Sequence, residues 1–325
     1  MKFRFELTGK EIFVYFLVVI LISIGLNLFN TYTIKSISNE KSSSISLIRG
    51  LYLIIALILY WIIMAICQYY ICKKSIDSLF FNELKFNFNG KLDEFLWINI
   101  SSLFLLIITL FLYTPKYIQR MVKYYVNNIN YNDNDFDFYG KASNLFAIML
   151  FTFLIPLILV TVIIIKFTAK LDINESILRF ILIPIDFIIY TPFIFLFYKW
   201  IIQIKYLNYN IKLDAKFLKS VLFLLGQIVL SIITLSIYFP VALIKIYQYF
   251  LPKISISKDE NIEFQIKTDF IIFDSWKYLW GQIILSIITL GIYIPWTYCN
   301  IFNYIITKIY IEKKVEFNQT GEITN

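Results

Sequence analysis

The sequence of 325 residues contains no histidine and only three cysteines. Without histidine the chain cannot form a Ser–His or Cys–His nucleophile pair, a histidine metal site or the usual side-chain switch near neutral pH. Cys67, Cys72 and Cys299 show no Cys-x-x-Cys spacing, so neither a zinc site nor a redox pair is predicted. A glycine-rich phosphate loop and a G-x-S-x-G turn are also missing from the sequence. We therefore expect a protein that is not an enzyme, with no catalytic, cofactor-binding or metal-binding residues.

Charged residues are scarce as well, at 16% of the chain, whereas hydrophobic residues make up 59%. Soluble proteins average about 25% charged and roughly 45–50% apolar residues, and a soluble domain of this length cannot bury so much apolar side chain. A lipid bilayer acting as the outer solvent explains the composition. The net charge of +8 does not indicate a nucleic-acid partner, because the basic residues lie mainly between apolar stretches.

Apolar stretches long enough to cross a bilayer occur about seven times, since a spanning helix needs about 20 mainly apolar residues. Three shorter segments begin at Pro115, Pro240 and Pro295, and each is either a tilted span or a helix lying at the interface. The expected fold is an all-α polytopic membrane protein with about 7–10 membrane helices. The long candidates are 12–32, 49–72, 95–114, 144–166, 177–203, 217–239 and 276–295.

The distribution of basic residues favours one orientation in the membrane. Lys2, Arg4 and Lys10 precede the first apolar stretch, and Lys73 and Lys74 follow the second. Because cytoplasmic loops are enriched in Lys and Arg, we expect a cytoplasmic N-terminus. The first stretch is followed by no small-x-small cleavage site, so we expect a retained helix rather than a signal peptide.

Internal repetition is the clearest sign of organisation. The segment 226–240 reads GQIVLSIITLSIYFP and the segment 281–295 reads GQIILSIITLGIYIP, which is 12 identities in 15 positions at a spacing of 55. A third copy, IITLFLYTP, occupies 107–115. Such duplication is common in membrane proteins. The expected segments are an N-terminal transmembrane hairpin (1–80), a repeat unit (81–135), a central transmembrane hairpin (136–208), a second repeat unit (209–255) and a third with a polar tail (256–325).

The repeated motif Thr-Leu-x-(Ile/Leu)-Tyr-x-Pro predicts a break between two helical pieces. Proline favours a helix start, threonine can bond a carbonyl one turn earlier, and tyrosine suits the headgroup level. The simple interpretation is a repeated corner between helices. The alternative is that paired broken helices frame a solute site near the midplane. The residues concerned are Thr109, Tyr113, Pro115, Thr234, Tyr238, Pro240, Thr289, Tyr293, Pro295 and Trp296.

Period-two alternation of apolar residues precedes several of the helices. It is clearest at 86–90 and 136–140, looser at 3–5, and recurs at Val315, Phe317 and Gly321. Alternation that ends in glycine predicts a short strand and a turn. We expect these β-like segments at the water interface, where unpaired backbone groups can be solvated.

Two features point to contacts with lipids or ions. Lys116, Arg120 and Lys123 recur at steps of three or four after a proline and predict a basic helix face that touches lipid headgroups, including anionic ones. Asp186 is a carboxylate deep in an apolar run between two prolines. It is either an ion or solute site, with Lys245 as a candidate partner, or a residue close to the interface that is satisfied by helix-end donors.

The chain resembles the YjgN-like family of bacterial inner-membrane proteins, a domain of unknown function. The family pattern combines a Phe-x-Phe-x-Gly entry, a Glu-Phe pair and Thr-Leu-Gly-Ile-Tyr-x-Pro-Trp, which correspond here to 86–90, 94–95 and 289–296. The other two copies of the turn lack the glycine, and Lys116 and Val241 replace the tryptophan. The resemblance implies a multi-pass protein of the bacterial cytoplasmic membrane and carries over no activity.

Function is predicted only as a choice between classes. Repeats, broken helices and Asp186 favour transport of a small solute or ion. The basic interfacial helix favours the alternative, a lipid-interacting or scaffolding protein without transport or catalysis. The expected partners are membrane lipids, and no protein partner or oligomeric state is predicted.

Overall fold

The computed structural model describes residues 1–39, 43–171, 175–258 and 261–313. Within these residues a helical hairpin followed by one or two strands recurs five times. In chain order the elements are β1 (Phe3–Phe5), α1 (Gly9–Asn39), α2 (Ser43–Asp77), β2 (Leu79–Phe81), β3 (Leu84–Phe88), α3 (Leu92–Ile108), α4 (Thr114–Asn127), β4 (Ile129–Tyr131), β5 (Asn134–Phe138), α5 (Ala142–Met149), η1 (Leu150–Leu154), α6 (Ile155–Leu171), α7 (Glu175–Ile201), β6 (Ile204–Tyr206), β7 (Tyr209–Leu213), α8 (Phe217–Ile233), α9 (Phe239–Phe250), η2 (Leu251–Lys253), β8 (Ile254–Lys258), β9 (Asn261–Thr268), α10 (Ile272–Ile288), α11 (Ile294–Thr307) and β10 (Ile309–Lys313).

The ten strands of the described residues form one antiparallel sheet in chain order, which we call the strand ring. Each strand pairs with the next, from β1 with β2 to β9 with β10. An isolated bridge between Lys2 and Tyr310 brings the two ends of the sheet together. Met1 and Ile311 exchange backbone hydrogen bonds beside it, at 3.0 and 2.9 Å. The first and last strands of the described chain therefore meet and nearly close the ring.

The helices form a second ring above the first. Each hairpin packs against its neighbours along the chain, and α11 packs against α1. The last contact depends on Gly9, which begins α1 and lies against Trp296 near the start of α11. The aromatic ring of Trp296 also lies 5.4 Å from that of Phe13, centroid to centroid. Both rings are thus joined where the two ends of the chain meet.

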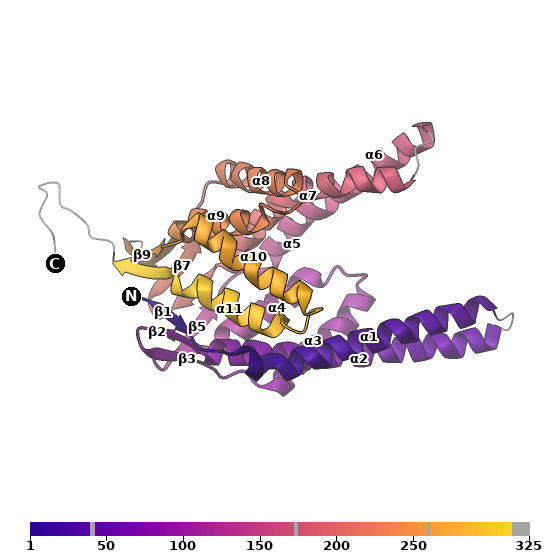
Figure 1. Cartoon of the computed structure of the whole chain (residues 1–325), viewed down its shortest axis with the longest axis horizontal. Helices are drawn as coiled ribbons and strands as arrows, with labels where there is room; N and C mark the ends of the chain where they lie inside the picture. The colour runs from indigo at the N-terminus through magenta and orange to yellow at the C-terminus, as the bar shows by residue number, and fades with distance from the viewer. Residues whose placement is uncertain (40–42, 172–174, 259–260, 314–325) are drawn as a thin grey trace, which may run out of the picture.

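The hairpins differ in length, as Figure 1 shows. The α1–α2 and α6–α7 hairpins extend well beyond the other three, away from the strands. Among the described residues, three helical segments are long and apolar enough to cross a membrane: Gly9–Phe29, Gly50–Asp77 and Ala142–Ile164. The third contains a π-helical segment, Leu150–Leu154, just before Pro156, whose missing N–H interrupts the regular bonding.

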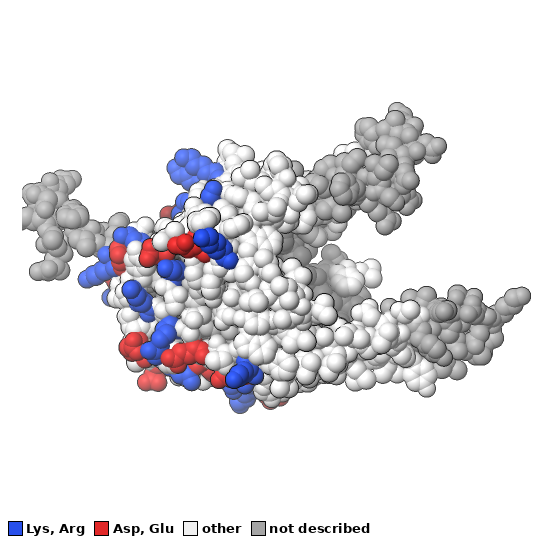
Figure 2. Space-filling view, in the orientation of Figure 1, with Lys and Arg blue, Asp and Glu red and all other residues white. Residues whose placement is uncertain are grey.

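Charge is divided along the same long axis. On the face shown in Figure 2, the Lys, Arg, Asp and Glu side chains gather at the end that holds the strands, whereas the described helical half is almost free of them. Large apolar side chains are instead exposed along the helices, for example Leu21 at 58% and Phe104 at 66%. An exposed apolar surface of this extent is typical of a membrane or protein contact.

Alternation in the strands separates a polar outer face from an apolar inner one. In β3, Phe86 and Phe88 are buried on the inner face, and Lys85 and Asn87 between and beside them are exposed. The inner residue nearest the helices is buried beneath a hairpin in several strands, as Phe88 is against Phe95 and Tyr124. Related clusters lie under the neighbouring hairpins, so the hydrophobic core is distributed around the ring.

The three shorter hairpins end in the same turn, at Thr109–Tyr113, Thr234–Tyr238 and Thr289–Tyr293. In each, the threonine Oγ1 donates to the carbonyl four residues earlier at 2.7 or 2.8 Å and accepts the tyrosine N–H at 3.1 Å. The two residues after the threonine have positive φ, and the second donates its N–H to the carbonyl five residues earlier. This pattern closes the C-terminal end of the helix.

The turns lead to a prediction about stability, because only one of them has glycine at the second left-handed position. Gly291 has φ +88°, and Ser236 occupies the matching position with φ 69°. A side chain in this region costs about 1–2 kcal/mol. We expect Gly291→Ala to lower the free energy of unfolding by about 1 kcal/mol and Ser236→Gly to raise it slightly. Thermal unfolding in detergent measures both, and equal shifts of the same sign would contradict this backbone geometry.

The structure confirms the helical part of the predicted fold. Every predicted long stretch overlaps a helix, although 95–114, 217–239 and 276–295 run past the helix ends into the turns, and the segments after the three prolines form α4, α9 and α11. The predicted number of 7–10 membrane helices stays a prediction, since three described segments are long and apolar enough to span. The all-α class is not confirmed, because the strands join into one nearly closed sheet. The predicted β-like segments at 3–5, 86–90 and 136–140 contribute β1, β3 and β5, whereas the segment from Val315 to Gly321 lies outside the described residues. The boundaries of the five predicted segments stay a prediction.

Candidate functional site

The inner face of the strand ring lines a partly open apolar cavity of about 420 Å³, which we call the ring chamber. Most of its lining comes from the inward positions of the strands, and the ends of α2 and α4 add Ile76 and Val126. All the lining residues are aliphatic or aromatic. They are Phe3, Ile76, Leu79, Phe81, Phe86, Val126, Ile129, Tyr131, Phe136, Ile204, Tyr206, Tyr209, Ile211, Ile256, Phe264, Ile266 and Ile311.

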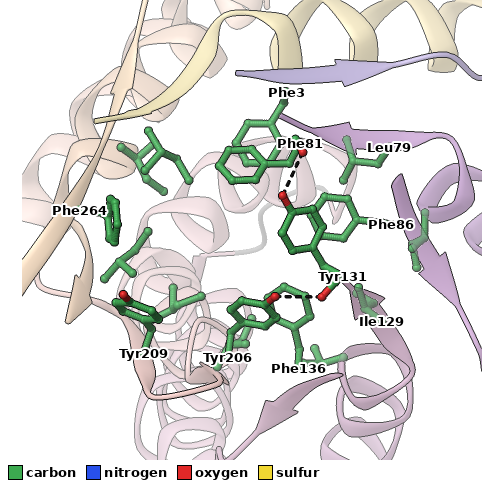
Figure 3. Close-up of a pocket in the computed structure, with 17 residues that line it drawn as sticks. Phe3, Leu79, Phe81, Phe86, Ile129, Tyr131, Phe136, Tyr206, Tyr209 and Phe264 are labelled. Atoms are coloured by element: carbon green, nitrogen blue, oxygen red, sulfur yellow. Dashed lines mark hydrogen bonds between the residues drawn. The ribbon is translucent and has the colours of Figure 1, made fainter. Parts of the chain in front are cut away.

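Aromatic rings in mutual contact form one wall of the chamber (Figure 3). The ring of Phe136 lies 4.6 Å from that of Tyr206, and the ring of Phe86 lies 4.8 Å from that of Tyr131, centroid to centroid. Phe3 and Phe81 continue the wall at 4.6 Å. Such tilted and offset pairs are each worth about 0.5–1.5 kcal/mol beyond the area they bury. The wall is therefore held in place by its own contacts.

The tyrosine hydroxyls of this wall are already occupied by the protein. Tyr131 donates to the carbonyl of Phe81 at 3.0 Å, and Tyr206 donates to the carbonyl of Tyr131 at 2.9 Å, as the dashed lines in Figure 3 mark. Tyr209 donates to Glu263 Oε2 at 3.0 Å. Each hydroxyl proton is thus directed to a fixed acceptor rather than offered to a ligand.

The tyrosines of the chamber remain uncharged at neutral pH. Burial raises the pKa of Tyr206, and burial followed by the neighbouring Tyr206 raises the pKa of Tyr131. For Tyr209 the hydrogen bond to Glu263 is the main cause of the raised pKa. Since phenols ordinarily titrate near pH 10, the chamber presents neutral groups under physiological conditions.

This lining determines what the chamber can hold. A water molecule in a cavity needs two to four polar partners, and an ion needs groups that replace its hydration shell. The chamber offers neither, whereas it matches the mainly apolar pockets of roughly 300–1,000 Å³ that bind small organic ligands. It is suited to an apolar ligand, and the lining residues that the structure describes include no carboxylate, amine or thiol.

The turn residues predicted from the sequence lie elsewhere. Thr109, Thr234 and Thr289, with the tyrosine and proline of each copy, sit at the hairpin ends away from the strands. Pro115, Pro240 and Pro295 are buried near the starts of α4, α9 and α11. The hydrogen bonds of the turns therefore support their interpretation as corners between helices. The solute site that the broken helices were suggested to frame stays a prediction.

The three basic residues predicted to touch lipid headgroups have different surroundings. Lys116 is exposed beside its turn and donates to Gln119 Oε1 at 2.9 Å. Arg120 points into the α3–α4 hairpin, where Nη1 donates to Ser101 Oγ at 3.1 Å and Ser102 Oγ at 3.2 Å. Lys123 is exposed. Contact with headgroups stays a prediction for all three.

Asp186 belongs to α7, and its side chain lies outside the described part of the chain. Its suggested partner Lys245 is half-buried on α9, with Nζ 5.4 Å from the centre of the Tyr238 ring. Whether the two side chains approach each other therefore stays a prediction.

The ring chamber was missed by reasoning from the sequence, although one signal for it was available. The alternation noted at 86–88 and 136–138 recurs as Tyr-Asn-Ile-Lys-Leu at 209–213 and as Ile-Glu-Phe-Gln-Ile at 262–266. Each stretch has one apolar and one polar face. Reading all of them as strands of one sheet would have predicted a continuous apolar inner surface.

Comparison with known proteins places the chain in a family without a known activity. A family model described as "Bacterial protein of unknown function (DUF898)" matches residues 1–269. No curated protein matches the chain. No solved structure matches it either.

Proposed function

Because this chain belongs to the YjgN-like family of bacterial proteins of unknown function, membership assigns no activity, and we propose from the structure that it is a multi-pass membrane protein that binds the apolar chain of a lipid in its ring chamber. The observation that carries the proposal is the lining of that chamber, which consists of aliphatic and aromatic side chains only. A chain of methylene groups needs no polar partner and gains roughly 0.8 kcal/mol for each buried CH₂ group.

The distribution of charge supports an arrangement in the membrane. The charged strand end faces water and the sparsely charged helical half enters the bilayer, with the long helices crossing it (Figure 2). The lysines at the strand end, among them Lys2, Lys73 and Lys85, favour the cytoplasmic side of the inner membrane for the ring and for the N-terminus. The chamber then lies next to the cytoplasmic headgroups, within reach of a lipid tail.

Ligand capture tests this proposal. A fatty acid and a phospholipid, each with a photoactivatable diazirine at the end of the acyl chain, are added to the purified protein, and the cross-linked peptides are mapped by mass spectrometry. We expect cross-links on the strands that line the chamber. Cross-links confined to the outer surface of the helices would show annular lipid only and would overturn the proposal.

A matched pair of variants on β8 sharpens this test. Ile256 points into the chamber, and Ser257 is its outward-facing neighbour on the same strand. Ile256→Trp fills part of the chamber and is expected to reduce chamber labelling about tenfold, which corresponds to about 1.4 kcal/mol of binding free energy. Ser257→Trp adds the same side chain outside and is expected to leave labelling unchanged. Equal labelling of the two variants would contradict the proposal, and Ile256→Phe serves as a milder filling variant.

Transport of a small solute or ion is the second candidate, and the observation that favours it is the ring of helices that continues above the chamber. An apolar constriction on such an axis can gate a pathway by excluding water. Proteoliposomes that contain the wild type or Asp186→Asn distinguish the candidates. A proton or cation flux that the substitution abolishes supports transport, and equal flux from the two proteins and from empty vesicles rejects it.

A further inference from the structure

The turns that close the α8–α9 and α10–α11 hairpins carry the two most exposed large apolar side chains that the structure describes. Leu235 is 87% exposed and Leu290 is 93% exposed, and their neighbours Ile237 and Ile292 are also exposed. Apolar side chains at the tip of a hairpin are unfavourable in water. In a chain that enters a bilayer, the question is whether these side chains lie inside the hydrocarbon layer or in the water beyond it.

The hairpin arms are too short to carry these tips across a bilayer. Between Lys277 on α10 and Lys308 after α11 the sequence has no charged residue, so this whole hairpin can enter the hydrocarbon. The rise from Lys277 to Leu290 at 1.5 Å per residue is about 20 Å, and the rise from Lys219 to Leu235 on the other hairpin is about 24 Å. The hydrocarbon layer is about 30 Å thick.

Tryptophans mark the level at which the α10–α11 hairpin enters the membrane. Trp276 and Trp280 flank Lys277 on α10, and both indole N–H groups donate to the carbonyl of Ile237, at 3.2 and 3.0 Å. Tryptophan and lysine together are typical of the headgroup boundary. The half-buried indoles thus hold the α8–α9 turn beside the base of α10, close to the headgroup boundary, whereas α10 continues beyond Trp280 to Ile288 before its own turn.

Both turns pair their backbone N–H groups locally. In the turn from Thr289 to Tyr293, each N–H donates within the turn or to the end of α10: Gly291 to Ser286 O at 2.8 Å, Ile292 to Thr289 O at 3.1 Å, and Tyr293 to Thr289 Oγ1 at 3.1 Å. The turn from Thr234 to Tyr238 repeats the pattern. An unpaired backbone N–H in lipid costs several kcal/mol, so the N–H groups of the turn from Thr289 to Tyr293 can enter hydrocarbon without that cost.

We propose that the α10–α11 hairpin is re-entrant, with its tip held by lipid acyl chains inside the hydrocarbon layer, while the long α1–α2 and α6–α7 hairpins cross it. The α8–α9 tip is not included, because the carbonyl of Ile237 in its turn accepts from the two tryptophans near the start of α10. The α3–α4 tip is not included, because the exposed Lys116 lies next to its turn. The inference rests on the membrane part of the proposed function and not on ligand binding in the ring chamber.

Accessibility of single cysteines tests the inference. In a background with Cys67, Cys72 and Cys299 replaced by alanine and checked for an unchanged elution profile, Leu290→Cys is treated with a membrane-impermeant maleimide. Spheroplasts and inverted vesicles expose the two sides in turn. We expect less than a tenth of full labelling from either side, and full labelling after SDS. Labelling of Leu290→Cys from the side opposite the ring would mean that the hairpin spans the membrane. Labelling from the ring side would mean that its tip lies in water. Either result overturns the inference.

Two controls separate failure of the inference from failure of the membrane assignment. Ser257→Cys on the outer face of the ring is expected to react from one side only. Leu21→Cys, which lies on α1 within a segment apolar enough to span, is expected to be protected. If Leu21→Cys reacts in intact membranes, the membrane assignment fails together with the inference. If Leu21→Cys is protected and Leu290→Cys reacts, only the inference fails.

A nitroxide attached to Leu290→Cys gives an independent measure of depth. Molecular oxygen concentrates in hydrocarbon, whereas a nickel chelate stays in water. We expect collisions with oxygen to exceed those with nickel, as at Leu21→Cys, and the order to be reversed at Ser257→Cys. The reversed order at Leu290→Cys would overturn the inference even if maleimide labelling were low.

Discussion

Gly9→Ala is expected to lower the free energy of unfolding by about 2–3 kcal/mol, the upper part of the range for overpacking. A Cβ at this position would lie 2.5 Å from Trp296 Cγ and 2.8 Å from Trp296 Cα. The second distance involves the backbone, so a change of side-chain rotamer cannot relieve the contact. Since α1 and α11 meet here, the substitution pushes apart the hairpins that close the helix ring. Thermal unfolding in detergent should show a midpoint that falls by several degrees.

Gly226→Ala is the matched control for this prediction. Gly226 lies in α8, where an added Cβ meets no atom within 4 Å. Alanine favours a helix over glycine by about 1 kcal/mol, so the control is expected to leave the midpoint unchanged or raise it. Both variants add a single methyl group. If Gly9→Ala unfolds at the same temperature as Gly226→Ala, then α1 and α11 do not pack as described.

This contact also shows how far sequence reasoning can reach. The motif that ends in Trp296 was recognised from its repetition, and the α10–α11 hairpin follows from its turn chemistry. What Trp296 packs against could not be predicted, because Gly9 is near the opposite end of the chain and only closure of the ring brings them together. Local patterns specify hairpins, and contacts between the chain ends depend on the number and tilt of all the elements between them.

The strands illustrate the same limit. The alternation of Phe86 and Phe88 was sufficient to predict β3, whereas β2 and β4 have only three residues and directly follow helices. A run such as Leu79–Phe81 has too few residues to distinguish a strand from the last turn of an apolar helix. The chamber appears only when all the strands are paired, so it could not be predicted from the strands that were recognised.

Phe95→Ala is expected to produce the largest loss of stability among these variants, about 3–5 kcal/mol. Phe95 has no exposed surface, and its ring lies 5.4 Å from that of Tyr124 and 5.8 Å from that of Tyr69. These two tyrosines donate at 2.7 Å to the carbonyls of Lys91 and Gly90, which lead into α3. The cavity left by alanine would therefore loosen packing and two hydrogen bonds together. The free energy of unfolding from chemical denaturation measures the effect.

The repeats provide an internal control, because Ser220 in α8 occupies the position that matches Phe95. Its hydroxyl is buried and makes no hydrogen bond in the described part of the chain. Removing an unsatisfied buried hydroxyl is neutral or stabilising, so Ser220→Ala is expected to leave stability unchanged or raise it. The third matching residue, Ser275, bonds the Tyr304 hydroxyl at 2.8 Å, and Ser275→Ala should cost about 1 kcal/mol. The expected loss in free energy of unfolding is therefore largest at Phe95, smaller at Ser275 and smallest at Ser220, because the three copies of the repeat pack this position differently. Equal losses at all three would show that the repeats do not share this register.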